Sequence, residues 1–343
     1  MKSQEPPQPF HIPIDRRRFF KSMALASAGF MLPGYLAEAL TISPSVTQGP
    51  YYPLASNFPL DDDNDLVKLN NNTTLAAGVV TYLSGRVLDA SGNPIRNALV
   101  ELWHADREGD YVYSNSAARN PACDANFAGF GQFLTSSTGA YYFRSVKAGL
   151  YNGRTRHYHL GVTIPGQTTR YTTQTFWNET AVDLNGNTWA TQNSNDSVYS
   201  PLTAAQKAAV NLTYVPVPGT TTGEVAGTFD FVVGLTPVEP NYPAAGGFLY
   251  QAALVSGPSG GNPRFKLTFP VYSGYTYEVY GNPTLADLDW RALPFSLTQT
   301  GTIDRNRQTV AADGSLSIYV EEKAVKDFYK VSFRPAGANT GTP

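Results

Sequence analysis

Short stretches in which apolar and polar residues alternate dominate this chain. A period of two is that of a β-strand with one face in a core, and it recurs at residues 79–89, 98–103 and 140–146. The turn-forming segment Ala90-Ser-Gly-Asn-Pro94 separates the first two. We therefore expect an all-β fold, an antiparallel β-sandwich, in which the first two stretches pair as a hairpin.

A polar, asparagine-rich region from 180 to 218 interrupts this pattern. It contains one helix signal, residues 203–210, which Pro201-Leu-Thr203 would begin. We expect the region to be a long excursion over the surface, closed by a strand-like segment at 227–235.

A second alternating region follows two stretches rich in proline, glycine and serine, 236–247 and 256–263. Such stretches are typical of linkers. They predict a larger β-sandwich domain over 40–245 and a small all-β appendage over 246–343. The strands expected in the appendage are 264–269, 275–280 and 327–333.

Composition narrows the classes of partner. The chain has 343 residues, 42% hydrophobic and only 15% charged, with a formal net charge of −2. This balance gives no reason to expect a nucleic acid or an acidic membrane surface as partner. The 21 tyrosines, 30 glycines and 25 prolines suit short strands joined by many turns. Cys123 is the only cysteine, so no intramolecular disulfide can form.

Residues 1–39 are predicted to be a signal peptide. Arg16-Arg-Arg18 precedes an apolar run from Met23 to Leu32, and Ala37-Glu-Ala39 has the spacing of a signal-peptidase site. This arrangement is typical of twin-arginine export. The run is far shorter than the roughly 20 residues that span a bilayer. We therefore expect cleavage after Ala39, no stable membrane insertion, and a periplasmic or extracellular protein.

Metal-binding side chains are concentrated between Tyr151 and His159, which reads Tyr-Asn-Gly-Arg-Thr-Arg-His-Tyr-His in a chain with four histidines. Alternate residues of a strand project from one face, so His157 and His159 would point to one spot and Tyr158 away from it. Two neutral imidazoles can share a metal ion. A His-x-His pair also occurs on solvated strands where the rings only pack or hydrogen-bond, so both interpretations stay open at this point.

Four segments resemble the intradiol ring-cleavage dioxygenases, the protocatechuate and catechol dioxygenase family, and in particular its exported members. They occur in the family's order and together cover about residues 45–178. The four are Thr47-Gln-Gly-Pro-Tyr-Tyr52, the stretch from Gly85-Arg-Val-Leu-Asp89 to Pro94, Val100-Glu-Leu-Trp-His-Ala-Asp106 continuing to Tyr111, and Tyr151 to His159.

The resemblance implies the family's β-sandwich and a non-haem Fe(III) site held by two tyrosinates and two histidines. By position in the motifs, these ligands are Tyr111, Tyr151, His157 and His159. Phenolate is a hard anionic donor, which favours ferric over ferrous iron. The family's reaction cleaves a catechol-type ring with O2 between its two hydroxyl-bearing carbons and yields a muconate-type diacid.

Further roles follow from the same resemblance. Tyr151 would be both ligand and base, Arg154 would stabilise negative charge on the substrate ring, and Gln174 falls where the family has a glutamine behind the ligands. Thr155 and Arg156, before the first histidine, depart from the family's usual sequence motif. The direction in which the Arg156 side chain points is left open.

Other candidates are discounted or kept as alternatives. His104 is expected to be structural or to lie behind the ligands, and Asp61 to Asp65 is interpreted as a solvated turn because it lacks the glycine and glutamate of a calcium loop. An exported, non-catalytic glycan-binding sandwich remains the alternative function, followed by a zinc or copper enzyme that uses only the histidine pair. A homo-oligomer is compatible with the sequence but is not indicated by it.

Overall fold

The computed structural model contains the larger sandwich and most of the appendage. The predicted signal peptide and part of the polar excursion lie outside the described residues. Those residues are 40–54, 58–69, 73–113, 118–151, 153–178, 193–220, 222–237, 251–282, 291–321 and 328–335.

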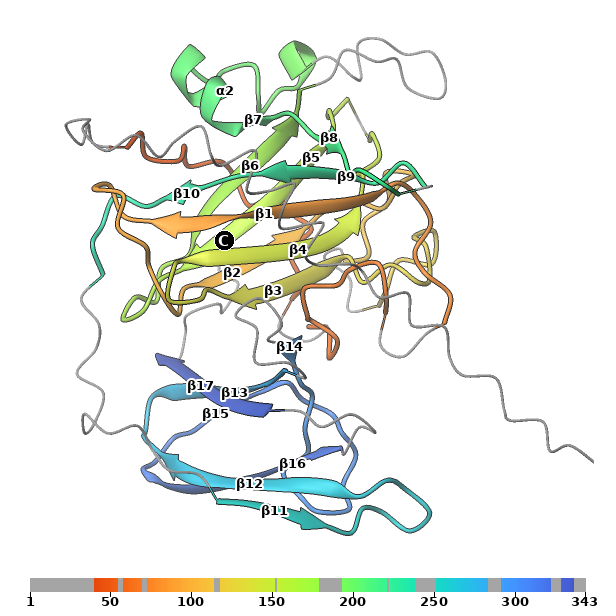
Figure 1. Ribbon diagram of the computed structural model, residues 1–343, viewed down its shortest axis with the longest axis vertical. Coiled ribbons are helices and arrows are strands. Elements are labelled where there is room, and N and C mark those ends of the chain that lie inside the picture. The colour runs from red at the N-terminus through yellow and green to blue at the C-terminus, as the bar shows by residue number, and fades with distance from the viewer. Residues whose placement is uncertain are drawn as a thin grey trace, which may run out of the picture.

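Two sheets form the larger sandwich (Figure 1). In the first sheet, the central strand β1 pairs antiparallel with β4 and parallel with β9 and β10, and β8 pairs with β9. The second sheet has the order β3-β2-β5-β6-β7. The strands are β1 (Val80–Leu88), β2 (Leu99–Trp103), β3 (Phe130–Leu134), β4 (Ala140–Val146), β5 (His157–Thr163), β6 (Tyr171–Trp177), β7 (Asn211–Leu212), β8 (Val215–Pro216), β9 (Val225–Thr228) and β10 (Phe231–Val232).

The all-β prediction is confirmed, but the predicted hairpin is wrong. The turn after β1 does form, since the Asp89 amide donates to the Asn93 carbonyl. The chain then crosses to the other sheet, where β2 pairs with β3 and β5. Asn97 lies in this crossing with φ 55°, a left-handed conformation that asparagine tolerates better than most residues. Turn chemistry therefore located the reversal of the chain but not the partner of each strand.

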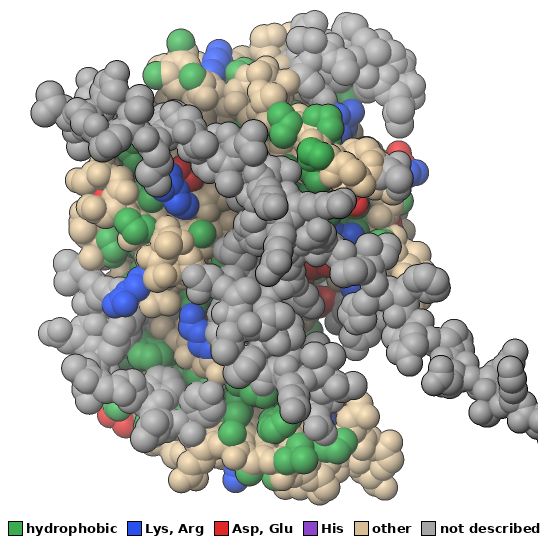
Figure 2. Space-filling view, viewed as in Figure 1, with side chains coloured by type: hydrophobic (Ala, Val, Ile, Leu, Met, Phe, Trp, Pro, Cys, Tyr) green, Lys and Arg blue, Asp and Glu red, His purple; other side chains and the backbone are tan. Residues whose placement is uncertain are grey.

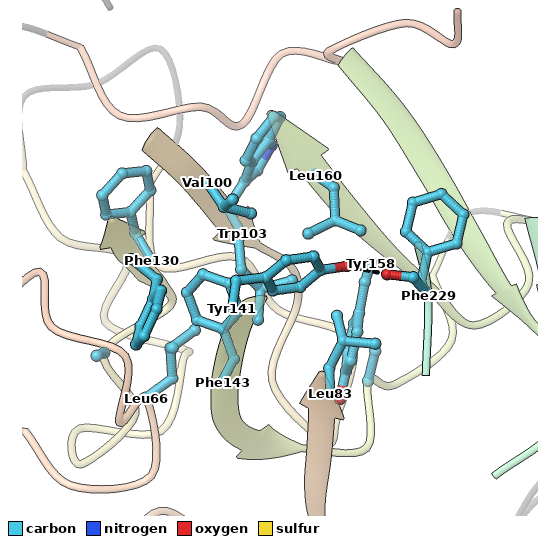
Figure 3. Close-up of a cluster of buried hydrophobic side chains, with 14 of the residues drawn as sticks. Leu66, Leu83, Val100, Trp103, Phe130, Tyr141, Phe143, Tyr158, Leu160 and Phe229 are labelled. Atoms are coloured by element: carbon cyan, nitrogen blue, oxygen red, sulfur yellow. Dashed lines mark hydrogen bonds between the residues drawn. The ribbon is translucent and has the colours of Figure 1, made fainter. Parts of the chain in front are cut away.

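The core lies between the two sheets (Figure 3). From β5, Tyr158, Leu160 and Val162 point into it, and the Tyr158 hydroxyl donates to the Val146 carbonyl at 2.6 Å. The alternate residues His157 and His159 are therefore on the opposite face of the sheet. The predicted alternation along this strand, with Tyr158 in the core, is confirmed.

The polar excursion is more closely packed than its composition suggested. The predicted helix exists as α2 (Ala204–Val210), and Thr203 forms a capping box with Gln206. Before it, the 3-10 turn η3 (Asn193–Asn195) leads into Asp196, which is buried, and into Tyr199, whose ring packs on Phe176 of β6. The described part of this region lies on the surface, as expected, with most of its residues exposed or half-buried, and a few buried side chains anchor it to the second sheet.

The appendage has its own hydrophobic core and forms the lower lobe in Figure 1. The predicted boundary at 245/246 lies outside the described residues and stays a prediction. Two sheets, β11-β12-β16 and β14-β13-β15 with β17 on β13, enclose this core. The strands are β11 (Gln251–Val255), β12 (Arg264–Val271), β13 (Tyr275–Asn282), β14 (Arg291–Ala292), β15 (Arg307–Thr309), β16 (Gly314–Glu321) and β17 (Phe328–Pro335).

A buried polar contact joins the appendage to the larger sandwich. Asp62 accepts a hydrogen bond from Gln132 of β3 at 2.7 Å and another from Asn306 of the appendage. The Arg307 guanidinium lies 3.6 Å from the same carboxylate and 3.9 Å above the Phe58 ring. Asp62 and Asn64 are buried, so the interpretation of Asp61 to Asp65 as a solvated turn is wrong.

On the face shown in Figure 2, the charged side chains of the described residues are scattered among uncharged ones. Within the described residues, no helix has the length and apolar character needed to cross a membrane.

Candidate metal centre

Strand β5 presents both histidines to one point. His157 Nε2 lies 3.2 Å and His159 Nε2 3.0 Å from the hydroxyl oxygen of Tyr111. The Nδ1 atom of His157 lies 2.6 Å from the Thr155 carbonyl. A carbonyl can only accept, so this contact places the His157 proton on Nδ1 and leaves the Nε2 lone pair directed at the phenol.

The two tyrosines come from two different loops. Tyr111 follows β2 and is buried, whereas Tyr151 precedes β5 and is half-buried. Their rings meet edge to face with centroids 5.3 Å apart, and the Tyr151 ring lies 5.7 Å from that of His157. The structure thus brings together the four side chains that the sequence motifs singled out.

Burial controls the protonation of this group. It raises the pKa of Tyr111 well above the ordinary value, and the neighbouring Tyr151 raises it further. Burial also lowers the pKa of His157 to about 4, with the positive charge of Arg154 acting in the same direction. The pKa of His159 is lowered well below its usual range by burial and by His157. Both imidazoles are therefore neutral at ordinary pH, the form in which histidine binds a metal.

This donor set fits a trivalent cation. The described residues contain no group of three or more histidine, cysteine or carboxylate side chains that could hold a metal. The convergent donors are two phenols and two imidazoles instead, with Tyr111 in contact with both histidines. A cation among them would favour loss of the phenol protons, because bound metal ions strongly stabilise anionic ligands. Hard oxygen donors combined with imidazole suit ferric iron.

Arg154 and Gln174 lie beside the ligands in one hydrogen-bonded chain. The Arg154 NH2 group donates to Gln174 Oε1 at 2.6 Å, and Gln174 Nε2 donates to the Thr47 carbonyl at 2.8 Å. Gln174 is opposite His159 in the pairing of β5 with β6. The predicted arginine and glutamine are therefore adjacent to each other and to the histidine strand.

The segment of Thr47 to Tyr52 covers this centre, a function that sequence reasoning did not assign. The Tyr51 ring stacks on Tyr111 with centroids 4.2 Å apart and planes 14° apart. Gly49 has φ 70°, and a Cβ there would lie 3.2 Å from His159 Cε1. The motif that contains Tyr51 was recognised, so this residue could have been proposed from its position.

Two other residues around the centre were also missed or only partly foreseen. Trp103, opposite His159 in the pairing of β2 with β5, stacks on its ring with centroids 5.1 Å apart. Asp196 accepts a hydrogen bond from Arg154 Nε at 2.8 Å. Trp103 lies in a recognised motif, but Asp196 lies in the asparagine-rich region and had no signal of its own.

His104 and Arg156 point away from the group. His104 is buried, with Nδ1 at 2.6 Å from the Ala105 carbonyl and Nε2 at 2.6 Å from the Ser145 hydroxyl. This confirms its expected structural character. The Arg156 NH1 group donates to the Ala148 carbonyl at 2.7 Å, which settles the direction that the sequence left open.

Comparison with known proteins finds relatives of one segment of the chain. Residues 47–182 match a family model described as dioxygenase. They include all six predicted site residues. The protocatechuate 3,4-dioxygenase beta chain of Burkholderia cepacia is 38% identical over 102 residues, which is 30% of this chain and 42% of that protein. This segment is therefore similar both to the dioxygenase family model and to a protocatechuate dioxygenase chain.

Other similar proteins share less sequence identity with the chain. Catechol 1,2-dioxygenase 2 of Acinetobacter lwoffii is 29% identical to this chain over 142 residues, which is 36% of this chain and 47% of that protein. The chain therefore spans less than half the length of either relative. Among solved structures, the dioxygenase domain of a dioxygenase carbohydrate-binding protein fusion from Streptomyces sp. SirexAA-E has 25% identity and a TM-score of 0.40, covering 57% of this chain and 100% of that domain.

Proposed function

We propose that the protein is an exported non-haem Fe(III) intradiol dioxygenase that opens a catechol-type ring between its hydroxyl-bearing carbons with O2. The observation that carries the proposal is the approach of both histidine Nε2 atoms to the Tyr111 hydroxyl, with the Tyr151 ring beside them. Tyr111, Tyr151, His157 and His159 would hold the iron. A ferric ion there would bind the catechol as a dianion and make its ring electron-rich toward O2.

The two tyrosines are assigned different tasks because their surroundings differ. Tyr111 is buried against both histidines, which suits a permanent ligand. Tyr151 is half-buried, and so its phenol has room to turn toward solvent. We assign to Tyr151 the uptake of a proton from a substrate hydroxyl, as a ligand that also serves as a base.

Arg154 is assigned to the substrate. Arginine carries a fixed positive charge, which would stabilise negative charge that develops on the ring. Gln174 holds one of its nitrogens, and through the Thr47 carbonyl connects it to the segment that covers the centre.

The decisive experiment is spectroscopic. Purified protein with one iron per chain should be red-brown from charge transfer between phenolate and Fe(III), should change its spectrum on addition of dihydroxybenzenes, and should consume O2 with at least one of them to give a ring-opened diacid. Protein that ferric iron cannot colour would refute the proposal.

Replacing single ligands tests the assignment of roles. His159→Ala should lose iron and with it all turnover, since it removes one of the protein's neutral nitrogen donors. Tyr151→Phe removes both a ligand and the proposed base, so turnover should fall by at least ~10²-fold. Turnover and bound iron are measured on the same samples, and full activity in either variant would contradict the assignment.

The alternative functions gain no support from the structure. Within the described part of the appendage, no tyrosine or phenylalanine whose side chain is described is fully exposed, so no exposed aromatic ring there favours glycan binding. A zinc or copper site that used only the histidine pair would leave unexplained the phenol that both histidines contact.

Export by the twin-arginine pathway is part of the proposal. It rests on the arginine motif, the short apolar run and the small-residue site in residues 1–39. This pathway carries folded proteins, which suits a metal centre that is assembled before export. Cell fractionation with and without a functional twin-arginine translocase would test it.

A further inference from the structure

Asp196 is a buried carboxylate beside the metal centre that no motif singled out. Only 1% of its surface is exposed. Its Oδ2 atom accepts hydrogen bonds from Arg154 Nε at 2.8 Å and from the Thr155 amide at 2.9 Å. Its Oδ1 atom accepts from the amides of Val198 at 2.8 Å and Tyr199 at 3.0 Å. The Asp196 carboxylate, in the polar region before α2, thus accepts all four hydrogen bonds.

The first consequence concerns Arg154. Asp196 holds its Nε, while Gln174 holds its NH2 group at 2.6 Å. Because the guanidinium is rigid and planar, bonds at two different nitrogens fix both its position and its plane. The ion pair with Asp196 is also shielded from water, since the two side chains are only 13% and 0% exposed. Arg154 thus approaches the centre from a fixed direction.

The second consequence concerns His157. The Thr155 residue whose amide donates to Asp196 also provides the carbonyl that lies 2.6 Å from His157 Nδ1. The Thr155 side chain is held as well, because its hydroxyl donates to Asn193 Oδ1 at 2.9 Å. Asp196 and Asn193 therefore hold Thr155 in place, and with it the carbonyl that orients the His157 imidazole.

The polar segment that supplies Asp196 is itself anchored to the second sheet. Asn193 Nδ2 donates to the Trp177 carbonyl at 3.0 Å, and the Tyr199 ring packs on Phe176 with centroids 4.8 Å apart. The Asp196 amide donates to the Asn193 carbonyl, which closes a tight turn. These contacts place the carboxylate at the end of β6 independently of its bonds to Arg154 and Thr155.

We infer that Asp196 is a positioning residue of the metal centre, which acts through the Arg154 guanidinium and, by way of Thr155, through the His157 imidazole. The inference rests on the proposed function for the role of Arg154 but not for the orientation of His157. Replacing a group that holds a metal ligand in place commonly lowers metal affinity or activity by ~10- to 100-fold. If Asp196 supported only the fold of its own segment, replacing it would change the stability of the protein and leave metal affinity and activity unchanged.

The test compares Asp196→Asn with a matched control, Asp89→Asn. Asp89 is also buried and also accepts amide hydrogen bonds, from Ser91 and Asn93, but in the turn after β1 and without an arginine. Ferric-ion affinity is measured in the absence of substrate by competition with a chelator. The charge-transfer spectrum, the catechol-induced change in it, and kcat and KM are measured separately.

We expect Asp196→Asn to bind ferric ion ~10- to 100-fold more weakly than the wild type, to lower kcat more than it raises KM, and to alter the spectrum of the catechol complex. Asp89→Asn should lower the melting temperature and leave all three properties unchanged. In Arg154→Ala protein, Asp196→Asn should cause a smaller further loss of kcat than it does alone, because part of its effect passes through Arg154.

Two results would overturn the inference: unchanged iron affinity and kcat in Asp196→Asn, or changes no larger than those of Asp89→Asn. The proposed function fails in a different way. Wild-type protein that binds ferric ion but never reacts with catechols would reject the reaction, while the difference in iron affinity between the two variants would still decide the role of Asp196.

Discussion

Single residues show where sequence reasoning succeeds and where it stops. His157 and His159 could be placed on one face from strand periodicity alone, and Tyr111 and Tyr151 from their positions in recognisable motifs. Asp196 could not, because it reaches Arg154 across 42 positions of sequence from a polar region without periodicity. A local sequence pattern predicts which residues of one strand share a face, whereas it does not predict hydrogen bonds between residues far apart in the sequence.

His104 gives a pH prediction at this scale. Burial lowers its pKa to about 3. The unfolded chain, with an ordinary histidine pKa near ~6.5, then binds the proton first as pH falls. Stability from this residue is complete above about pH 6.5 and is lost toward pH 3, at up to about 1.4 kcal/mol per pH unit. Urea unfolding in a chelator should show a shallower pH dependence for His104→Gln. Equal slopes would contradict the prediction.

At the scale of elements, turns were easier to predict than pairings. The strand bounds of β4 matched the expected 140–146, and α2 began where its capping residue indicated. The β1–β2 hairpin failed because turn residues fix the local reversal, while the burial of both strands in separate sheets is a property of the whole domain. The segment Thr47 to Tyr52 was recognised as a motif, but its position over the centre could not be predicted, since its contacts are with side chains far along the chain.

A buried ion pair fastens this cover and gives an element-scale prediction. Arg170 NH1 donates to Glu101 Oε2 at 3.3 Å, its NH2 group donates to Gln48, and its guanidinium lies 3.8 Å from the Tyr52 ring. Tyr52 in turn donates to Glu101 Oε1 at 2.7 Å. Arg170→Met leaves Glu101 buried without its cation, which should cost about 3–5 kcal/mol of unfolding free energy.

Denaturant unfolding measures that loss, and Arg86 provides the control. Its pair with Asp230 is exposed, with 53% and 32% of the side chains accessible, so Arg86→Met should cost less than about 1 kcal/mol. Cleavage by a protease in residues 40–54 should also increase in Arg170→Met only. Similar losses in the two variants would show that the cover does not depend on the buried pair.

At the scale of the whole molecule, composition predicted a second all-β unit but not its attachment. Burial raises the pKa of Asp62, and the positive charge of the nearby Arg307 acts in the opposite direction. The same Arg307 lies over Phe58, whose ring packs against Phe130 of β3 with centroids 4.8 Å apart. The appendage thus contacts the segment that runs from the cover toward β1, and we expect the two lobes to unfold together.

Arg307→Met should uncouple them. The variant leaves the Asp62 carboxylate buried without its cation, so calorimetry should resolve two transitions where the wild type shows one. Arg305→Met is the control, because its pair with Asp304 is exposed, with 35% and 50% of the side chains accessible. A single unchanged transition in Arg307→Met would indicate that apolar contacts alone join the lobes.

The pairing of β1 has a consequence for the order in which the protein is built. This strand appears early in synthesis, yet two of its neighbours, β9 and β10, are translated about 140 residues later. Until they emerge, one edge of β1 is open to pairing with other chains. The sheet around β1 therefore cannot be completed until residue 232 has been synthesised, which makes folding of the larger lobe slow for its size, and a chain truncated before residue 232 should be prone to aggregate.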